Sequence, residues 1–116
     1  MNDASLDFGP AVVPFNRVVV GDDVAVSFQI VNADGTPYNL SSATFTAEIS
    51  RLDGSIVGSF SIGNGISVSG NVVEWLIPSS LTAQLNYCSS YRYELVMINS
   101  GKKRTLLDGP FRVFKD

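Results

Sequence analysis

Alternation of apolar and polar residues at every second position is the feature that most restricts the fold of this chain. In the segment 24–30, Val24, Val26, Phe28 and Ile30 share one side of an extended backbone, and the residues between them are small or polar. A period of two indicates a β-strand with one buried face. We therefore expect a β-sheet protein in which each strand contributes one face to a common core.

The same alternation returns along the chain, with turn sequences such as Asp34-Gly35 and Asp53-Gly54 between the alternating segments. Strands repeated at intervals of roughly eight to twelve residues are typical of antiparallel sandwiches, and here the pattern predicts about eight of them. The predicted strands cover 12–20, 23–31, 43–51, 56–62, 66–69, 72–77, 89–98 and 104–115. We expect the last segment to divide into two short strands at a turn formed by Asp108-Gly109-Pro110.

The stretch 78–86 departs from this pattern. Pro78 can open a helical turn, and Leu81 and Leu85 are four residues apart, as on one face of a helix. We expect one short helix or 3₁₀ turn here. A tyrosine at position 91 resembles the tyrosine corner of sandwich folds, in which the ring is buried and the hydroxyl bonds to backbone. The predicted core consists of Val24, Val26, Phe28, Ile30, Phe45, Ile49, Trp75, Leu81, Tyr91, Tyr93 and Leu95.

Composition bounds the class of protein and its partners. The chain has 116 residues, the size of one domain, with a net charge of −3 and only 16% charged residues. A charge fraction this low fits either a surface partly covered by neighbours or one rich in Ser, Thr and Asn. The one basic run, 102–104, is expected at a solvated hairpin tip, so we expect no nucleic-acid partner.

Cellular location is constrained only by what the sequence lacks. The first residues carry two acids and no apolar core of a signal peptide, and no apolar run approaches the ~20 residues of a membrane span. Cys88 is the only cysteine, so no internal disulfide can form. We expect a protein made in the cytoplasm, with no membrane partner.

Gly21-Asp22-Asp23 resembles the metal-binding turn of nucleic-acid polymerases. That chemistry needs further carboxylates on another strand, a much larger domain and a basic channel, so we expect a simple turn between two strands. The chain has no histidine, which excludes Ser-His and Cys-His pairs. Glu48, Glu74 and Glu94 fall on the outward phase of their strands. We expect no catalytic, cofactor-binding or metal-binding residues, and only an exposed carboxylate pair facing a cleft would favour an enzyme.

Aromatic residues offer an alternative of another class, a carbohydrate-binding module for adhesion to host polysaccharide. Trp75 shares its phase with Val73 and Ile77, which indicates a core position first. The alternative would be favoured if two or more aromatic side chains lined one exposed surface. The candidates for such a surface are Trp75, Tyr38, Tyr87 and Tyr93.

Three long stretches, taken in order, resemble a known class of domain. They are "VVVGDDVAVSFQIVNADGTPYNLSSATFTAEIS", "VVEWLIPSSLTAQLNYCSSYRYELVMI" and "TLLDGPFRV". Together they are similar to small Ig-like domains of tailed-phage tail, baseplate and fibre proteins, and among named families to the N-terminal domain of phage baseplate upper proteins. The resemblance covers about residues 12–115, and it implies an all-β, Ig-like antiparallel β-sandwich of 7–8 strands.

The resemblance also implies a function. Such a chain would be a structural, non-enzymatic virion component of the tail, baseplate, fibre or neck that docks to other virion proteins, as a homo-oligomer or ring-associated subunit without a cofactor. Domains of this family often continue into a helix and a receptor-binding module, whereas this sequence stops at Asp116, which favours an adaptor or decoration subunit.

The first residues are expected to act separately from the domain. We predict a flexible arm over 1–11 and a single domain over 12–116, with the arm ordering against a neighbour. Unpaired edge strands and such an arm are common means of docking. The predicted interface residues are Leu6, Phe8, Pro10, Val12, Val13, Pro14 and Phe15.

Overall fold

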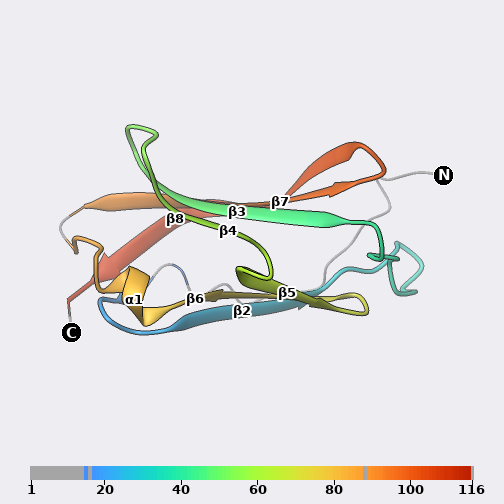
Figure 1. The fold of residues 1–116 in the computed structure, drawn as a ribbon, viewed down its shortest axis with the longest axis horizontal. Coiled ribbons are helices and arrows are strands. Elements are labelled where there is room, and N and C mark those ends of the chain that lie inside the picture. The colour runs from blue at the N-terminus through green and yellow to red at the C-terminus, as the bar shows by residue number, and fades with distance from the viewer. Residues whose placement is uncertain (1–14, 16, 88, 116) are drawn as a thin grey trace.

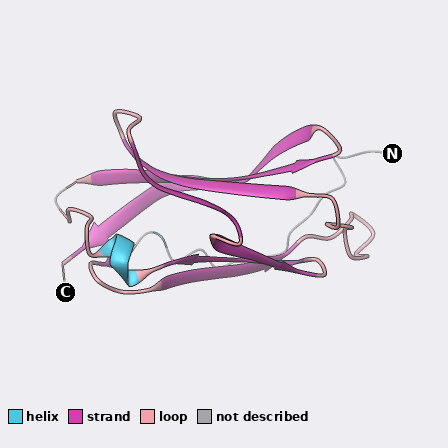
Figure 2. Ribbon diagram, in the orientation of Figure 1, coloured by secondary structure: helices cyan, strands magenta, loops and turns pink. Residues whose placement is uncertain are grey.

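The computed structural model describes residues 15, 17–87 and 89–115, and they fold into two packed β-layers. Strands dominate, and the helix is a single short turn (Figure 2). The strands follow the hydrogen-bonded order β1-β8-β7-β3-β4-β5-β6-β2. Their bounds are β1 Val18–Val19, β2 Val24–Gln29, β3 Thr44–Arg51, β4 Ile56–Ile62, β5 Gly65–Ser69, β6 Val72–Ile77, β7 Ser90–Asn99 and β8 Lys102–Phe114; α1 covers Ser79–Thr82.

Strand β4 connects the two layers. It pairs antiparallel with β3 in the layer of β3, β7 and β8, and its end then pairs in parallel with β5 through Ser61–Gly65 and Ile62–Ile66. Figure 1 shows β4 passing from the upper layer to the lower layer, which holds β5, β6 and β2. All other pairings are antiparallel except that of β1 with β8. The predicted antiparallel sandwich is therefore confirmed, with these two parallel pairings added.

The core lies between the layers and matches the predicted set closely. Every predicted core residue is buried except Leu81, which is half-buried and packs against the core. Trp75, Ile49 and Leu95 are fully inaccessible. The tyrosine corner is also present, because the Asn86 backbone N–H donates to the Tyr91 hydroxyl at 2.9 Å. Period-two alternation predicted these positions because each strand is buried on one face only.

Phe15 corrects the prediction that it belongs to an interface segment. Its side chain is 1% exposed, and its ring centroid lies 5.1 Å from that of Trp75, 4.5 Å from that of Tyr93 and 5.2 Å from that of Phe111. The contacts with Trp75 and Tyr93 are edge-to-face, a geometry that stabilises a core beyond the burial of area alone. Phe15 is thus a core residue. The other predicted interface residues, Leu6, Phe8, Pro10, Val12, Val13 and Pro14, lie outside the described residues, as does the predicted arm.

Strand β8 corrects a second prediction, because Asp108-Gly109-Pro110 forms no turn. The strand continues through it, with Asp108 opposite Glu94 and Gly109 opposite Tyr93 on β7. A Cβ at Gly109 would meet the Tyr93 hydroxyl at 3.3 Å, so glycine leaves room for the tyrosine ring. Beside Pro110, β8 has a partner on one side only, since β1 pairs with just its last two residues, and proline is tolerated at such an edge.

Gly21-Asp22-Asp23 is the predicted turn, here between β1 and β2. The Asp22 N–H donates to the Val19 carbonyl at 3.0 Å. The Asp23 carboxylate accepts the Ser79 N–H at 2.6 Å, and the Thr82 hydroxyl accepts the Gly21 N–H at 3.2 Å and donates to the Asp22 carbonyl at 2.7 Å. The turn is therefore fastened to α1, the helix predicted within 78–86.

Replacing Thr82 by Val should lower the free energy of unfolding by about 1–3 kcal/mol, because valine keeps the shape and leaves the Gly21 N–H without its acceptor. Thr82 is fully buried, so water cannot substitute easily. Urea titration followed by tryptophan fluorescence measures the loss. Thr82→Ser, which retains the hydroxyl, is the control and should lose clearly less; an equal loss for both variants would show that the hydrogen bonds do not matter.

The two other Asp-Gly sequences do form tight turns, as predicted. In each turn, the aspartate Oδ1 accepts two hydrogen bonds, from the backbone N–H and from the hydroxyl of the residue two positions later. Asp34 accepts those of Thr36 at 3.0 and 2.6 Å, and Asp53 accepts those of Ser55 at 2.9 and 2.7 Å. These hydrogen bonds hold the pKa of both carboxyl groups below the usual value. The turns therefore favour the ionised form of each aspartate.

Candidate functional site

Three of the acidic residues form a row across the outer face of the upper layer. Glu48 lies opposite Glu94, and Glu94 lies opposite Asp108, on the adjacent strands β3, β7 and β8. All three side chains are exposed, as the outward phase of the two glutamates predicts. They border a hollow of 160 Å³ together with Arg92. Within the described part of the chain, no group of three or more Cys, Asp or Glu side chains is arranged to hold a metal ion.

The negative charge of Asp108 also acts on Tyr93, a buried residue of the neighbouring strand β7. Burial raises the pKa of the Tyr93 hydroxyl, and the negative charge of Asp108 raises this pKa further. The fold thus favours the neutral phenol. The stability contributed by this preference is complete below pH 10, the ordinary tyrosine pKa, and is lost as the pH rises through the higher pKa of the folded protein.

Asp108→Asn should therefore lower the pKa of Tyr93 while leaving it above the ordinary value, because burial is the larger cause. Ultraviolet absorbance or NMR titration of the tyrosine resonances measures the change. Glu74→Gln on the opposite layer is the matched control and should leave this pKa where it is. A Tyr93 pKa that does not move in Asp108→Asn would show that the carboxylate is screened by solvent.

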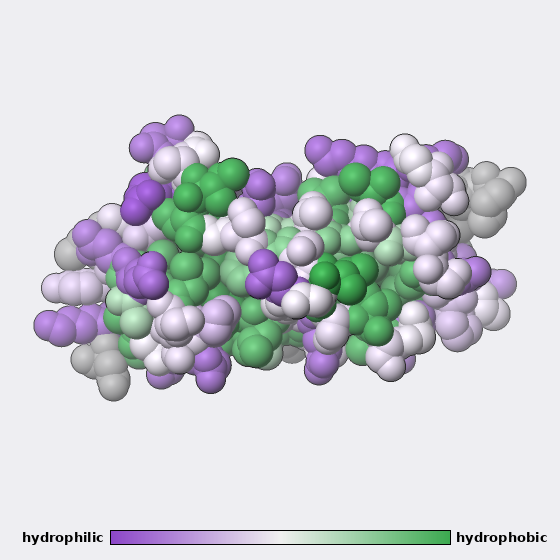
Figure 3. Space-filling model, viewed as in Figure 1, coloured by the Kyte–Doolittle hydropathy of each residue, from purple (hydrophilic) through white to green (hydrophobic). Residues whose placement is uncertain are grey.

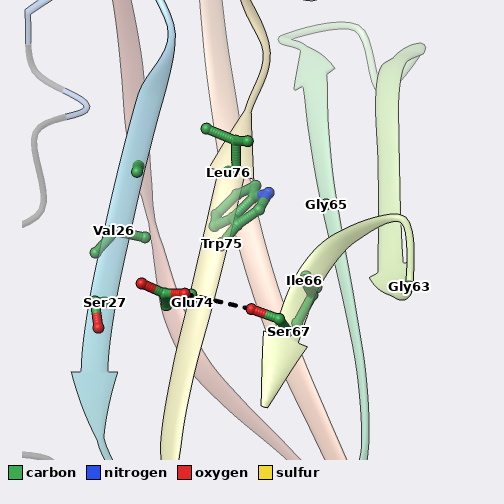
Figure 4. A pocket seen from close by; sticks show the side chains of 10 residues that line it. Val26, Ser27, Gly63, Gly65, Ile66, Ser67, Glu74, Trp75 and Leu76 are labelled. Atoms are coloured by element: carbon green, nitrogen blue, oxygen red, sulfur yellow. Dashed lines mark hydrogen bonds between the residues drawn. The ribbon is translucent and has the colours of Figure 1, made fainter. Parts of the chain in front are cut away.

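A larger hollow of 520 Å³ lies on the outer face of the lower layer, over β2, β6 and β5 (Figure 4). Small residues such as Ala25, Ser27 and Ser67 line it, with Leu76, which is 47% exposed. Glu74 is the one ionisable side chain in this lining, and its Oε1 accepts from the Ser67 hydroxyl at 3.5 Å. A single carboxylate on an open sheet provides no acid–base pair and no nucleophile with a base beside it.

The aromatic residues considered for sugar stacking do not share an exposed surface. Trp75 and Tyr93 are buried. Tyr38 is half-buried, and its hydroxyl accepts from the Asn99 amide at 3.2 Å near the end of β7. Tyr87 is 50% exposed but precedes the start of β7, at the opposite end of that strand. The described residues therefore lack the aromatic platform that would favour carbohydrate binding.

The end of the upper layer near the C-terminus carries a different kind of surface. A groove of 370 Å³ runs over the start of β7 and the end of β8, and we call it the end groove. Three exposed apolar side chains border it: Leu52, 67% exposed, Tyr87, and Phe114, 39% exposed. Leu52 belongs to the turn between β3 and β4, which projects above the upper layer in Figure 1. The surface view also shows hydrophobic residues reaching solvent among hydrophilic ones (Figure 3).

Positive charge surrounds the end groove. Arg92 and Arg112 line it, the Arg17 guanidinium lies 5.0 Å from the centre of the Phe114 ring, and the Lys115 ammonium lies 5.7 Å from that of Tyr87. These four are half of the chain's eight Lys and Arg residues, and among the described residues no carboxylate lines the groove. Exposed apolar and aromatic side chains flanked by arginine are typical of protein-binding surfaces. The end groove is therefore the strongest candidate functional site.

Sequence reasoning did not find the end groove. The structure places Arg92, Arg112 and Phe114 on the exposed phase of β7 and β8. What the sequence could not provide is the convergence of four distant segments: the β3–β4 turn, the loop before β7, the end of β8, and Arg17. A signal existed in "YRY" and "FRVFK", where cations alternate with aromatic residues near two strand ends.

Comparison with known proteins identifies the fold and no family. No protein-family model matches the sequence, and no curated protein matches it significantly. Among solved structures, the chain is similar to the filamin domain of Lin-41, with a TM-score of 0.51 and 14% identity over 95% of this chain and 92% of that one. The fold is an Ig-like β-sandwich. At this identity the similarity shows the fold alone.

A second solved structure, MtrC from Shewanella baltica, is similar to a lesser degree. The TM-score is 0.44 at 12% identity, over 93% of this chain and 22% of MtrC.

No helix among the described residues is long and apolar enough to span a membrane.

Proposed function

We propose that this Ig-like sandwich is a structural, non-enzymatic domain that works by docking to other proteins. The end groove is the observation that carries the proposal, because it exposes apolar side chains beside four exposed cations. Two of the other hollows support it indirectly. The hollow over β2, β6 and β5 has a single carboxylate, and the hollow of 160 Å³ beside the three exposed carboxylates is smaller than the ~300 Å³ at which ligand pockets usually begin.

The setting of this docking is a tailed-phage virion, in the tail, baseplate, fibre or neck. Support for this part comes from the sequence resemblance, which runs in order over nearly the whole chain. An Ig-like sandwich suits such a role, since an adaptor or decoration subunit needs a rigid body and a surface for its neighbours rather than a reaction centre. The partners would be other virion proteins, including further copies of the chain.

Mass spectrometry of virions purified from the phage that encodes this sequence tests the proposal. Peptides of this chain should be present in a fixed ratio to those of the tail proteins, and this ratio should not change on repeated density-gradient purification at low salt. A chain abundant in the infected cell and absent from the particles would contradict a structural role in the virion.

A further inference from the structure

The occupant of the end groove can be inferred from its chemistry. The groove combines apolar borders with Arg17, Arg92, Arg112 and Lys115, and the residues of its lining that the structure describes include no carboxylate. All four cations are exposed, so the groove presents net positive charge on a chain whose overall charge is −3. A complementary ligand carries carboxylates spaced among large apolar side chains.

The chain itself contains such a segment at its start. Residues 3–8 read Asp-Ala-Ser-Leu-Asp-Phe, with two carboxylates and two large apolar side chains, and no Lys or Arg precedes Arg17. The apolar borders of the groove offer contacts for Leu6 and Phe8, and its cations offer partners of opposite charge for Asp3 and Asp7. We propose that the end groove binds residues 3–8 of a second copy of this chain. This inference rests on the proposed docking function and names its partner.

The direction of the chain favours a second copy over the same copy. Strand β1 runs parallel to β8, with Val18 beside Val113 and Val19 beside Phe114, so the chain after Phe15 already runs toward the groove. Phe15 is buried between the two layers, so a segment of the same copy would be tethered to the core seven residues after Phe8. The segment of a neighbour has no such tether.

The contact is heterologous, because a segment of one copy occupies a groove of the next. The copy that supplies the segment still has a free groove, and the copy that supplies the groove still has a free segment. Association is therefore concentration-dependent and extends beyond dimers unless a ring closes. It also weakens as salt is added, since most of the charges involved are exposed and are screened.

Analytical ultracentrifugation of the full chain tests the inference with two charge-reversed variants. One carries Asp3→Lys and Asp7→Lys, and the other carries Arg92→Glu and Arg112→Glu. Each should associate at least about tenfold more weakly than the unmodified chain, because attraction becomes repulsion at the contact. An equimolar mixture should regain association, since the lysines of one variant then meet the glutamates of the other.

Lys103→Glu with Arg104→Glu is the matched control, because it reverses two charges at the opposite end of β8. It should associate as the unmodified chain does. Thermal unfolding by circular dichroism should be cooperative for every variant, which separates lost contact from lost fold.

Three results would overturn the inference: an unmodified chain that stays monomeric at every concentration, groove variants that associate normally, or a mixture that stays monomeric. A monomeric chain that is nevertheless found in virions would overturn this inference alone. A chain that self-associates and is absent from virions would leave the groove's occupant in place and overturn the proposed setting.

Discussion

Phe15→Ala is expected to lower the free energy of unfolding by about 3–5 kcal/mol, the usual cost of removing a large buried aromatic side chain. The ring is 1% exposed and touches Trp75, Tyr93 and Phe111, which belong to three strands of both layers. Its loss leaves a cavity where the layers meet. Chemical denaturation measures the effect, with Trp75 fluorescence as the probe.

Phe114→Ala is the matched control for this experiment. It removes the same ring from a position that is 39% exposed, beside the end groove. The expected cost is smaller, about 1–2 kcal/mol, because a large part of the ring is already in water and its removal leaves no enclosed cavity. If both variants lost the same stability, or if Phe15→Ala lost none, Phe15 would not belong to the core.

Gly65→Ala is expected to cost about 2–4 kcal/mol, the sum of backbone strain and a steric clash. Gly65 has φ +92° where the chain turns from β4 into β5. A Cβ there would lie 2.6 Å from Cδ2 of Phe60 and 3.2 Å from the Leu76 carbonyl oxygen. Phe60 is buried and the carbonyl belongs to β6, so neither can move away freely.

Gly63→Ala separates the two causes. Gly63 has φ +88°, nearly the same backbone conformation, but a Cβ there would meet nothing within 4 Å. It should cost only the strain, about 1–2 kcal/mol. The difference between the two losses in free energy of unfolding measures the steric clash of the new Cβ with Phe60 and the Leu76 carbonyl. Equal losses would show that these neighbours move aside at little cost.

The strands and the core could be predicted because each strand buries one face. Val24, Val26 and Phe28 alternate with small or polar neighbours, and the same rule that makes them a strand makes them core. The helix α1 was predictable for a local reason. Pro78 has no backbone N–H to donate to a neighbouring strand, so β6 ends before it, and proline is tolerated where a helix begins. Local chemistry also explains Asp34 and Asp53, whose side chains close their own turns.

The wrong predictions have one physical cause, which is that tertiary contacts decide between local alternatives. Asp108-Gly109 resembles the other Asp-Gly turns, yet the Tyr93 ring needs the space that Gly109 leaves, and the strand continues. Phe15 falls both in the predicted strand 12–20 and in the predicted docking segment, and nothing local distinguishes a core residue from a docking residue there. The end groove depends on segments that are far apart in the sequence.

Site-specific photo-cross-linking in assembled particles tests the central claim most directly, namely that this chain functions by docking through the end groove. A photoreactive phenylalanine derivative would replace Phe114 in one variant and Ile98 in another. Ile98 is similarly exposed, at 41%, and lies near the opposite end of β7. The account predicts cross-links to a neighbouring chain from position 114 and few from position 98. Cross-links from position 98 with none from position 114 would contradict it.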